Sequence, residues 1–195
     1  YEAVGSGVAG VAVVGAIGIG THSLRNLSST DANYSIGIGY NAGMAMTSGI
    51  GNVAVGYQSL DANTTGNNST AVGYHALQVN GDITNGENVA VGWQTGDAAT
   101  TGRYNTFIGA TAGGTVTTGG ALVMLGHGAD PSGNTTSGEI VLGYNATGIG
   151  ANYVVLGSGD ITRVYMSQDG DAVMYADGTI TTSDRRTKQN IEKLN

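Results

Sequence analysis

One short line of sequence, an apolar alternation that ends in glycine, recurs along most of the chain. Three copies are nearly identical: NVAVGYQSL at 52–60, STAVGYHAL at 69–77 and NVAVGWQTG at 88–96. Alignment on the glycine gives nine copies, whose repeat glycines are Gly20, Gly39, Gly56, Gly73, Gly92, Gly109, Gly126, Gly143 and Gly157. Successive glycines lie 19, 17, 17, 19, 17, 17, 17 and 14 residues apart. Such regular spacing is the signature of a repeat protein.

Each copy alternates with a period of two residues. The residue before the glycine is always Ile, Val or Leu, and two positions earlier stands another apolar or β-branched residue, as in Val53 and Val55. This period predicts a short strand with one buried face. The glycine then turns the chain, and Asn, Asp, Thr and Gly, which favour turns, fill the rest of the unit. The sequence therefore predicts an all-β fold, a parallel β-roll or β-helix solenoid with one coil per repeat.

The residue between the two apolar positions changes in size along the chain. It is Gly or Ala in the first five copies and larger in the last four, in the order Gly18, Gly37, Ala54, Ala71, Ala90, Phe107, Met124, Val141 and Val155. We expect the surroundings of this position to change near residue 100. A widening or a new register of the solenoid at that point is the interpretation we prefer.

The composition limits how such a solenoid can be stable. The 195 residues include 35 Gly and 1 Pro, and 40% are hydrophobic. A collagen-like chain is excluded because Pro is nearly absent and no Gly-x-y register persists, and the regular apolar clusters argue against disorder. One coil supplies only two or three apolar side chains, too few to offset the entropy lost on folding. We therefore expect a homotrimer, in which three chains bury their apolar faces along a common axis.

The charge is unevenly distributed. Residues 1–182 hold 12 acidic and 3 basic residues, whereas residues 183–195 hold 2 acidic and 4 basic residues. Binding to nucleic acid or to an anionic membrane needs a basic surface, so the acidic residues 1–182 argue against both partners. The chain has no cysteine and no apolar stretch of about 18 residues, the length that a membrane span needs. We expect no nucleic acid, no membrane insertion, no cofactor and no metal.

The repeats resemble two known groups of proteins. The stretch NVAVGYQSL…NNSTAVGYHAL resembles the head repeats of trimeric autotransporter adhesins, which form a left-handed parallel β-roll in a trimer, and similar repeats occur in bacteriophage tail fibres. The resemblance covers about residues 17–159. It implies an N-terminal connector over 1–16, the solenoid over 17–159, and a different structure beyond it.

The end of the chain resembles a second family. The segment DGTITTSDRRTKQNIEKLN (177–195) is similar to the entry of the intramolecular chaperone domain of phage tail fibres, tailspikes and endosialidases. In that family the domain trimerises the chain and in many members cuts itself off. The resemblance implies that 183–195 begins such a domain, with the remainder of the domain after residue 195. It also favours a tail fibre over an adhesin.

A self-cleavage motif is the only catalytic feature that the chain suggests. By resemblance, Ser183 is the nucleophile, Lys188 its base and Asp184 a residue that positions the turn. Such a pair needs a neutral lysine, whose pKa is lowered by burial. The alternative is that Ser183 caps a short C-terminal helix in which Lys188 and Glu192 pair at i,i+4. We expect no other enzymatic activity.

Aromatic residues follow the repeat glycine in most copies. We consider Tyr40, Tyr57, Tyr74 and Trp93 as receptor-binding residues, since exposed rings could stack on sugars, but a structural ladder between coils is the interpretation we favour. The three histidines show no metal-binding pattern. Between 160 and 182, Asp169-Gly170 and Asp177-Gly178 are typical of β-hairpin turns.

These features together predict a structural and receptor-binding segment of a phage tail fibre, located in the virion tail. Its expected partners are two further copies of the chain, other tail proteins, and a glycan or protein on the host surface. Three alternatives remain: a trimeric adhesin head on a bacterial surface, an ice-binding solenoid, and a tailspike depolymerase. Aligned Thr-x-Thr on a flat face would favour ice binding, and acidic residues clustered between coils would favour the depolymerase.

Overall fold

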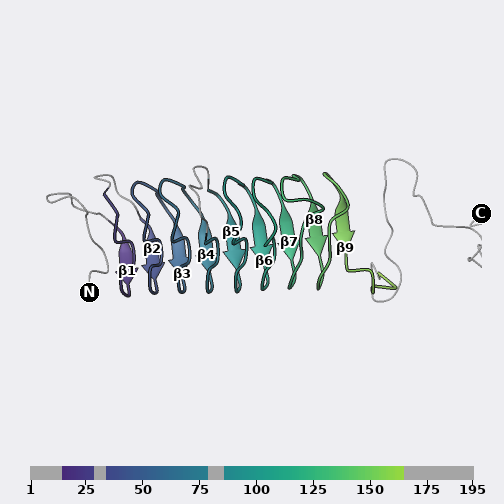
Figure 1. Cartoon of the computed structure of the whole chain (residues 1–195), viewed down its shortest axis with the longest axis horizontal. Helices are drawn as coiled ribbons and strands as arrows, with labels where there is room; N and C mark the ends of the chain where they lie inside the picture. Colours follow the sequence, from purple (N-terminus) through teal and green to yellow (C-terminus); the bar gives the residue numbers. More distant parts are fainter. Residues whose placement is uncertain (1–14, 29–33, 79–85, 165–195) are drawn as a thin grey trace, which may run out of the picture. The chain divides into compact units, whose positions relative to one another are not determined.

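A computed structural model describes residues 15–28, 34–78 and 86–164 (Figure 1). The chain divides into two compact units, residues 1–162 and 163–195, and the description below concerns the first. Within the described residues nine three-residue strands pair in chain order into one sheet. They are β1 (Ile17–Ile19), β2 (Ile36–Ile38), β3 (Val53–Val55), β4 (Thr70–Val72), β5 (Val89–Val91), β6 (Thr106–Ile108), β7 (Val123–Leu125), β8 (Ile140–Leu142) and β9 (Val154–Leu156).

All eight pairings are parallel, so the expected all-β parallel solenoid is confirmed. Each strand ends at its repeat glycine, and one coil carries the chain back to the start of the next strand. The hairpins and the C-terminal helix expected beyond residue 164 lie outside the described residues. Most of the N-terminal connector, up to residue 14, does so as well.

The register of the sheet is continuous from the first strand to the last. The two longer, 19-residue steps keep it, since Ile17 pairs with Ile36 and Thr70 with Val89. It also continues across residue 100, where Ala90 pairs with Phe107. Of the two explanations that we preferred, a widening or a new register, the new register is therefore wrong.

The interior of each coil receives the middle residue of the strand. Ala54, Ala71, Ala90 and Phe107 are fully buried, whereas the residues on either side of them are half-buried or exposed. Successive side chains of a strand point to opposite faces, so the two apolar columns lie outside the single chain. Our interpretation that these columns form the buried face is wrong for one chain by itself. The middle residue of the strand is therefore the one that points into the interior of the coil.

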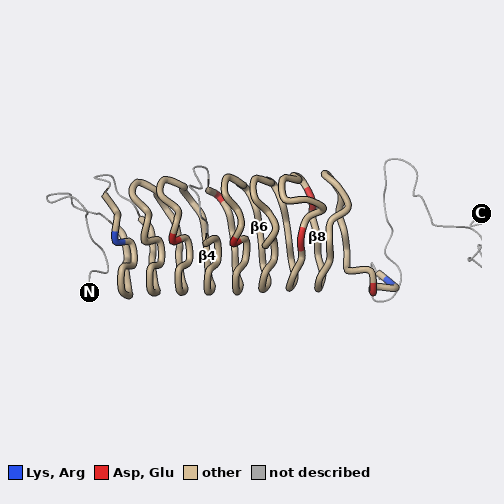
Figure 2. The backbone as a smooth tube through the Cα atoms, in the orientation of Figure 1, with Lys and Arg blue, Asp and Glu red and all other residues tan. Residues whose placement is uncertain are grey.

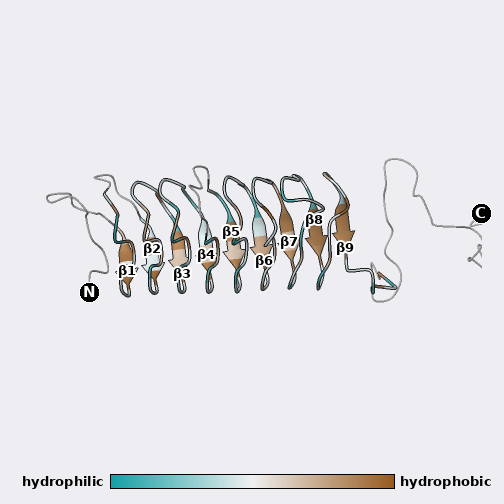
Figure 3. Cartoon of the chain, viewed as in Figure 1, coloured by the Kyte–Doolittle hydropathy of each residue, from teal (hydrophilic) through white to brown (hydrophobic). Residues whose placement is uncertain are grey.

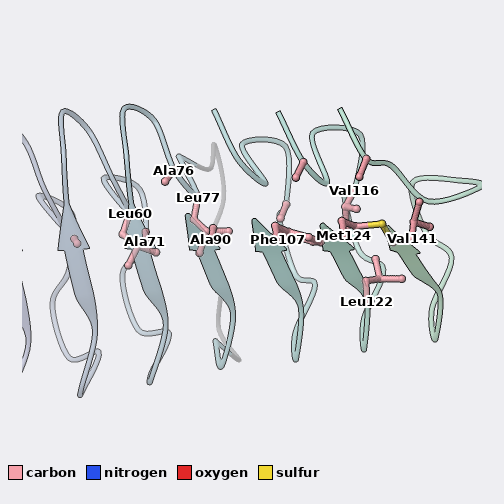
Figure 4. Close-up of a cluster of buried hydrophobic side chains, with 14 of the residues drawn as sticks. Leu60, Ala71, Ala76, Leu77, Ala90, Phe107, Val116, Leu122, Met124 and Val141 are labelled. Atoms are coloured by element: carbon pink, nitrogen blue, oxygen red, sulfur yellow. The ribbon is translucent and has the colours of Figure 1, made fainter. Parts of the chain in front are cut away.

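The size change near residue 100 is compensated inside the coil. In the coils after β1, β3, β4 and β5, the fourth residue after the repeat glycine packs against the middle strand residue of the following coil. A Cβ at Gly37 would lie 2.8 Å from Leu24 Cγ, and one at Gly96 would lie 2.7 Å from Phe107 Cδ2. Figure 4 shows Leu60 beside Ala71 and Leu77 beside Ala90. Leucine thus faces a small strand residue in the coils after β1, β3 and β4, and glycine leaves room for Phe107 in the coil after β5. After β2 both residues, Gly43 and Ala54, are small.

A ladder of polar side chains runs along the inside of the coils, four residues before the repeat glycines from Gly39 to Gly109. Its members with their side chains buried are Ser35, Asn52, Ser69, Asn88 and Asn105. Each side-chain oxygen accepts a hydrogen bond from the backbone N–H at the same position in the next coil, at 2.9–3.3 Å. The asparagines also donate from Nδ2 to a backbone carbonyl. The ladder satisfies backbone groups that are buried within the coil.

Glu139 occupies the same ladder position in the coil before β8 and is fully buried. Its Oε2 accepts hydrogen bonds from the backbone N–H and the hydroxyl of Ser132, at 2.9 and 3.1 Å. Its Oε1 accepts one from the N–H of Gly150 at 2.8 Å. The carboxylate of Glu139 thereby joins the turn of Ser132 to that of Gly150.

The repeat glycine is required by its conformation and by the approach of the next coil. From Gly39 to Gly143 its φ lies between +130° and +146°, a region that L-residues rarely adopt. A Cβ at Gly109 would lie 2.5 Å from the carbonyl carbon and oxygen of Gly126 in the next coil. Glycine at this position therefore both forms the turn and lets the coils stack at strand spacing.

Candidate functional site

The outer surface of the sheet, here called the strand face, consists of the first and third residues of the nine strands. Figure 3 shows how strongly apolar β7, β8 and β9 are. Its exposed apolar members, which are 36–59% accessible, are Ile17, Ile19, Ile38, Val89, Val91, Ile108, Leu125, Ile140, Val154 and Leu156. Nine parallel strands extend over roughly 38 Å at the usual spacing of about 4.8 Å. The strand face is therefore a two-column strip of side chains that are apolar apart from Thr70 and Thr106.

A second feature is the aromatic column, defined as the rings directly after a repeat glycine. Its members are Tyr40, Tyr57, Tyr74, Trp93, His127 and Tyr144. Tyr40 stacks on Tyr57 with ring centres 5.3 Å apart, and Tyr57 stacks on Tyr74 at 5.1 Å. His127 stacks on Tyr144 at 5.4 Å. The tyrosine and tryptophan rings are 42–68% exposed, so the column lies on the surface of the coils.

Stacking determines which parts of these rings a ligand can reach. Both faces of Tyr57 are covered, one by Tyr40 and the other by Tyr74. Offset stacking of this kind stabilises adjacent coils by about 0.5–1.5 kcal/mol per pair. The edges and hydroxyls remain in solvent. Tyr57 can therefore offer hydrogen bonds to a receptor in this arrangement, but no free ring face.

Beside the aromatic column runs a polar network on the same turns. His75 stacks on the ring of Tyr74 at 4.0 Å, and its Nε2 lies 2.9 Å from Oε1 of Gln58. The amide of Gln78 donates to Gln58 Oε1 and to Asp61 Oδ2, both at 3.5 Å. Burial raises the pKa of Asp61, and the bond from Gln78 opposes that shift. The network joins coils through side chains on their outer turns.

Two more acidic residues lie on the outer turns of later coils. A Cβ at Gly114 would lie 3.8 Å from Oδ1 of Asp97, so this carboxylate covers the glycine of the next coil. Asp130 Oδ1 accepts hydrogen bonds from the backbone N–H and the hydroxyl of Thr115, at 3.3 and 3.2 Å. Burial raises the pKa of both carboxyls, and repulsion from Asp130 further raises that of Asp97. Figure 2 shows how few charged residues the solenoid carries apart from these.

The sequence pattern alone did not identify the acidic residues as a group. Asp61 and Asp97 stand five residues after a repeat glycine, and Asp130 four residues after one. This spacing was visible in the sequence, but nothing in it says that those positions share one surface with the aromatic column. Ser183, Asp184 and Lys188 lie outside the described residues, so the self-cleavage motif stays a prediction.

Within the residues that the structure describes, no group of three or more His, Cys, Asp or Glu side chains is arranged to hold a metal ion. In the same residues, no helix has the length and apolarity needed to cross a membrane. Comparison of the chain with protein-family models, with curated proteins and with solved structures finds no match.

Proposed function

We propose that the chain is a structural and receptor-binding segment of a bacteriophage tail fibre, a homotrimeric shaft that attaches the virion to its host. The observation that carries the proposal is the strand face, whose two columns along nine strands are apolar except for Thr70 and Thr106. A contiguous apolar surface of this length marks an interaction site on a soluble protein. The resemblance of the repeats to tail-fibre and adhesin repeats supplies the number of chains and the biological setting.

Identical chains are the partners that best match this face. In a trimer with its axis along the solenoid, each chain presents the same in-register columns to its neighbours. Burial of the half-exposed Val, Ile and Leu side chains then contributes about 25 cal/mol for each Å² removed from water. Nine coils repeat the same small contribution, which suits a long and rigid shaft.

The threonines of the turns support the shaft over an ice-binding solenoid. The hydroxyls of Thr47, Thr100 and Thr117 each donate to the backbone carbonyl of the next coil, at 3.1–3.2 Å. Their hydrogens are therefore used within the fold. An ice-binding face needs aligned threonine hydroxyls that point to water.

Host attachment is tested with labelled wild-type chain and a panel of bacterial cells from which bound and free protein are separated by sedimentation. We expect saturable binding to at least one strain of the panel. An absence of binding to every strain would contradict the receptor-binding role. Tail structural genes beside this gene would support the fibre, whereas a membrane anchor encoded downstream would favour the bacterial adhesin.

The C-terminal motif is proposed to begin an intramolecular chaperone, with Ser183 as nucleophile, Lys188 as its activating base and Asp184 positioning the turn. The hydroxyl would attack a carbonyl immediately beside Ser183. Mass spectrometry of the full gene product should find two fragments that join at Ser183, and Ser183→Ala or Lys188→Ala should keep the chain whole while it still trimerises. An uncut wild type would leave the helix cap as the role of Ser183.

A further inference from the structure

The aromatic column is interrupted at one coil. The residue after the repeat glycine is Trp93 in the coil that follows β5, Ala110 in the next coil and His127 in the one after that. Backbone hydrogen bonds fix their order, because Thr111 N donates to Trp93 O at 2.8 Å and Gly128 N donates to Ala110 O at 2.9 Å. Ala110 therefore lies between two ring-bearing positions and contributes no ring of its own.

The spacing of the filled part of the column gives the size of this gap. Neighbouring rings stand 5.1–5.3 Å apart at Tyr40, Tyr57 and Tyr74. Positions two coils apart are separated by about 10 Å, which is twice the spacing of parallel strands. Carbon atoms in contact approach to about 3.5–4.0 Å on each side, so about 2–3 Å remains for the thickness of an inserted group. Tyr57 fills the equivalent space between Tyr40 and Tyr74, so one six-membered ring fits such a gap, and a pyranose ring also carries hydroxyl groups at its edge.

Two carboxylates lie on the turn that follows Ala110. The coil of Ala110 carries glycine at position 114, and the carboxylate of Asp97 lies over this glycine. Asp130, from the next coil, is held there by its two hydrogen bonds from Thr115. Carboxylate oxygens are acceptors only and can take several donors each. Hydroxyl groups at the edge of a sugar ring are such donors.

We propose that the gap over Ala110, between Trp93 and His127, binds one pyranose residue of a host-surface glycan, with Asp97 and Asp130 accepting hydrogen bonds from its hydroxyls. The proposal rests on the proposed function of host attachment and specifies where on the shaft the contact is made. Trp93 is 51% exposed, so its ring is accessible to the sugar. The stacked tyrosines earlier in the column support the coils, and the interruption provides the site.

The intrinsic tryptophan fluorescence of the chain reports on this site, because Trp93 is its one tryptophan. Tryptophan emission of the assembled full chain is recorded while the methyl pyranosides of glucose, galactose, mannose and N-acetylglucosamine are added separately. We expect a saturable change with at least one of them, with a Kd on the order of millimolar. Glycerol, which has hydroxyls but no ring, should give none. No saturable response to any of the four would overturn the proposal.

Filling the gap gives the matched test. Ala110→Tyr continues the aromatic column and should raise the Kd of the pyranoside at least about tenfold. The thermal unfolding temperature should stay the same or rise. Thr21→Tyr is the control, because it adds a ring at the same repeat position but outside the gap. Equal sugar binding by wild type and Ala110→Tyr would refute the site.

The two proposals fail separately. If labelled Ala110→Tyr attaches to bacterial cells as well as the wild type does, the shaft attaches to its host but this gap is not the contact, and the site is refuted. If the wild type responds to a pyranoside but binds no cells of the panel, the sugar site stands and the attachment role is contradicted.

Discussion

The compensation of side-chain sizes inside the coil can be tested at Phe107. Its ring occupies space that the glycines at 96 and 113 leave free, and it is fully buried. Phe107→Ala should cost about 3–5 kcal/mol, the usual range for removing a buried phenyl ring. For a chain of this size each kcal/mol lowers the unfolding temperature by about 2–4 °C, so a decrease on the order of 10 °C is expected.

A second substitution should recover much of this loss. Gly96→Leu combined with Phe107→Ala recreates the pair that Leu77 forms with Ala90 one coil earlier. Gly96 has a φ of +61°, and Leu77 adopts +48° at the same repeat position, so leucine fits this backbone at a cost of about 1–2 kcal/mol. By itself Gly96→Leu should destabilise, because its Cβ would lie 2.7 Å from the Phe107 ring.

The assay is thermal unfolding of all variants at one fixed protein concentration, since assembly makes the unfolding temperature depend on concentration. The double variant should unfold several degrees above Phe107→Ala. Phe107→Ala combined with Thr118→Leu is the control, because Thr118 is exposed and a leucine there does not enter the coil. If Gly96→Leu recovers no more than this control does, the packing argument is wrong.

Three further substitutions test other parts of the fold. Gly73→Ala should prevent soluble folding, because φ is +141° and a Cβ would collide with the next coil, whereas Gly159→Ala, with open space around it, should melt like the wild type. Asn105→Ala should cost about 1–3 kcal/mol for each buried backbone group it leaves unpaired, measured by denaturant unfolding, and a cost near zero would contradict the ladder. Burial raises the pKa of Asp61 above 3.8, so its ionisation opposes folding increasingly as the pH rises from there. Asp61→Asn should therefore be more stable than wild type at pH 7, and this advantage should disappear near pH 4; a constant difference would contradict it.

The strands could be located from the sequence because the repeat glycine marks them. Glycine with a positive φ and no room for a Cβ cannot be replaced at that point of the coil, so the alignment on Gly56 and its counterparts gave the right strand in every described copy. The assignment of faces failed for a physical reason. Both outer columns are apolar except for Thr70 and Thr106, whereas the inner position accepts Ala54 or Phe107 according to what lies beneath it.

The inner partners could not be recognised because they belong to different coils. That Gly96 makes room for Phe107 depends on knowing that the fourth residue after the glycine packs under the next strand. Asn52 and Asn88 could be taken for turn residues, because asparagine is common in turns. Their role in the inner ladder appears only once the coils are stacked. The interruption of the aromatic column at Ala110 was visible in the sequence, but the two carboxylates on the turn after it could not be placed there.

Assembly through the strand face is the central claim, and the native mass of the purified chain tests it most directly. Wild type and Gln58→Asp should give three times the chain mass, because Gln58 lies on an outer turn at a φ of +51° that aspartate tolerates. Val55→Asp should give no soluble trimer, since an unpaired charge buried in the interface costs several kcal/mol. A well-folded wild-type monomer, or trimers of equal stability for both variants, would contradict the account.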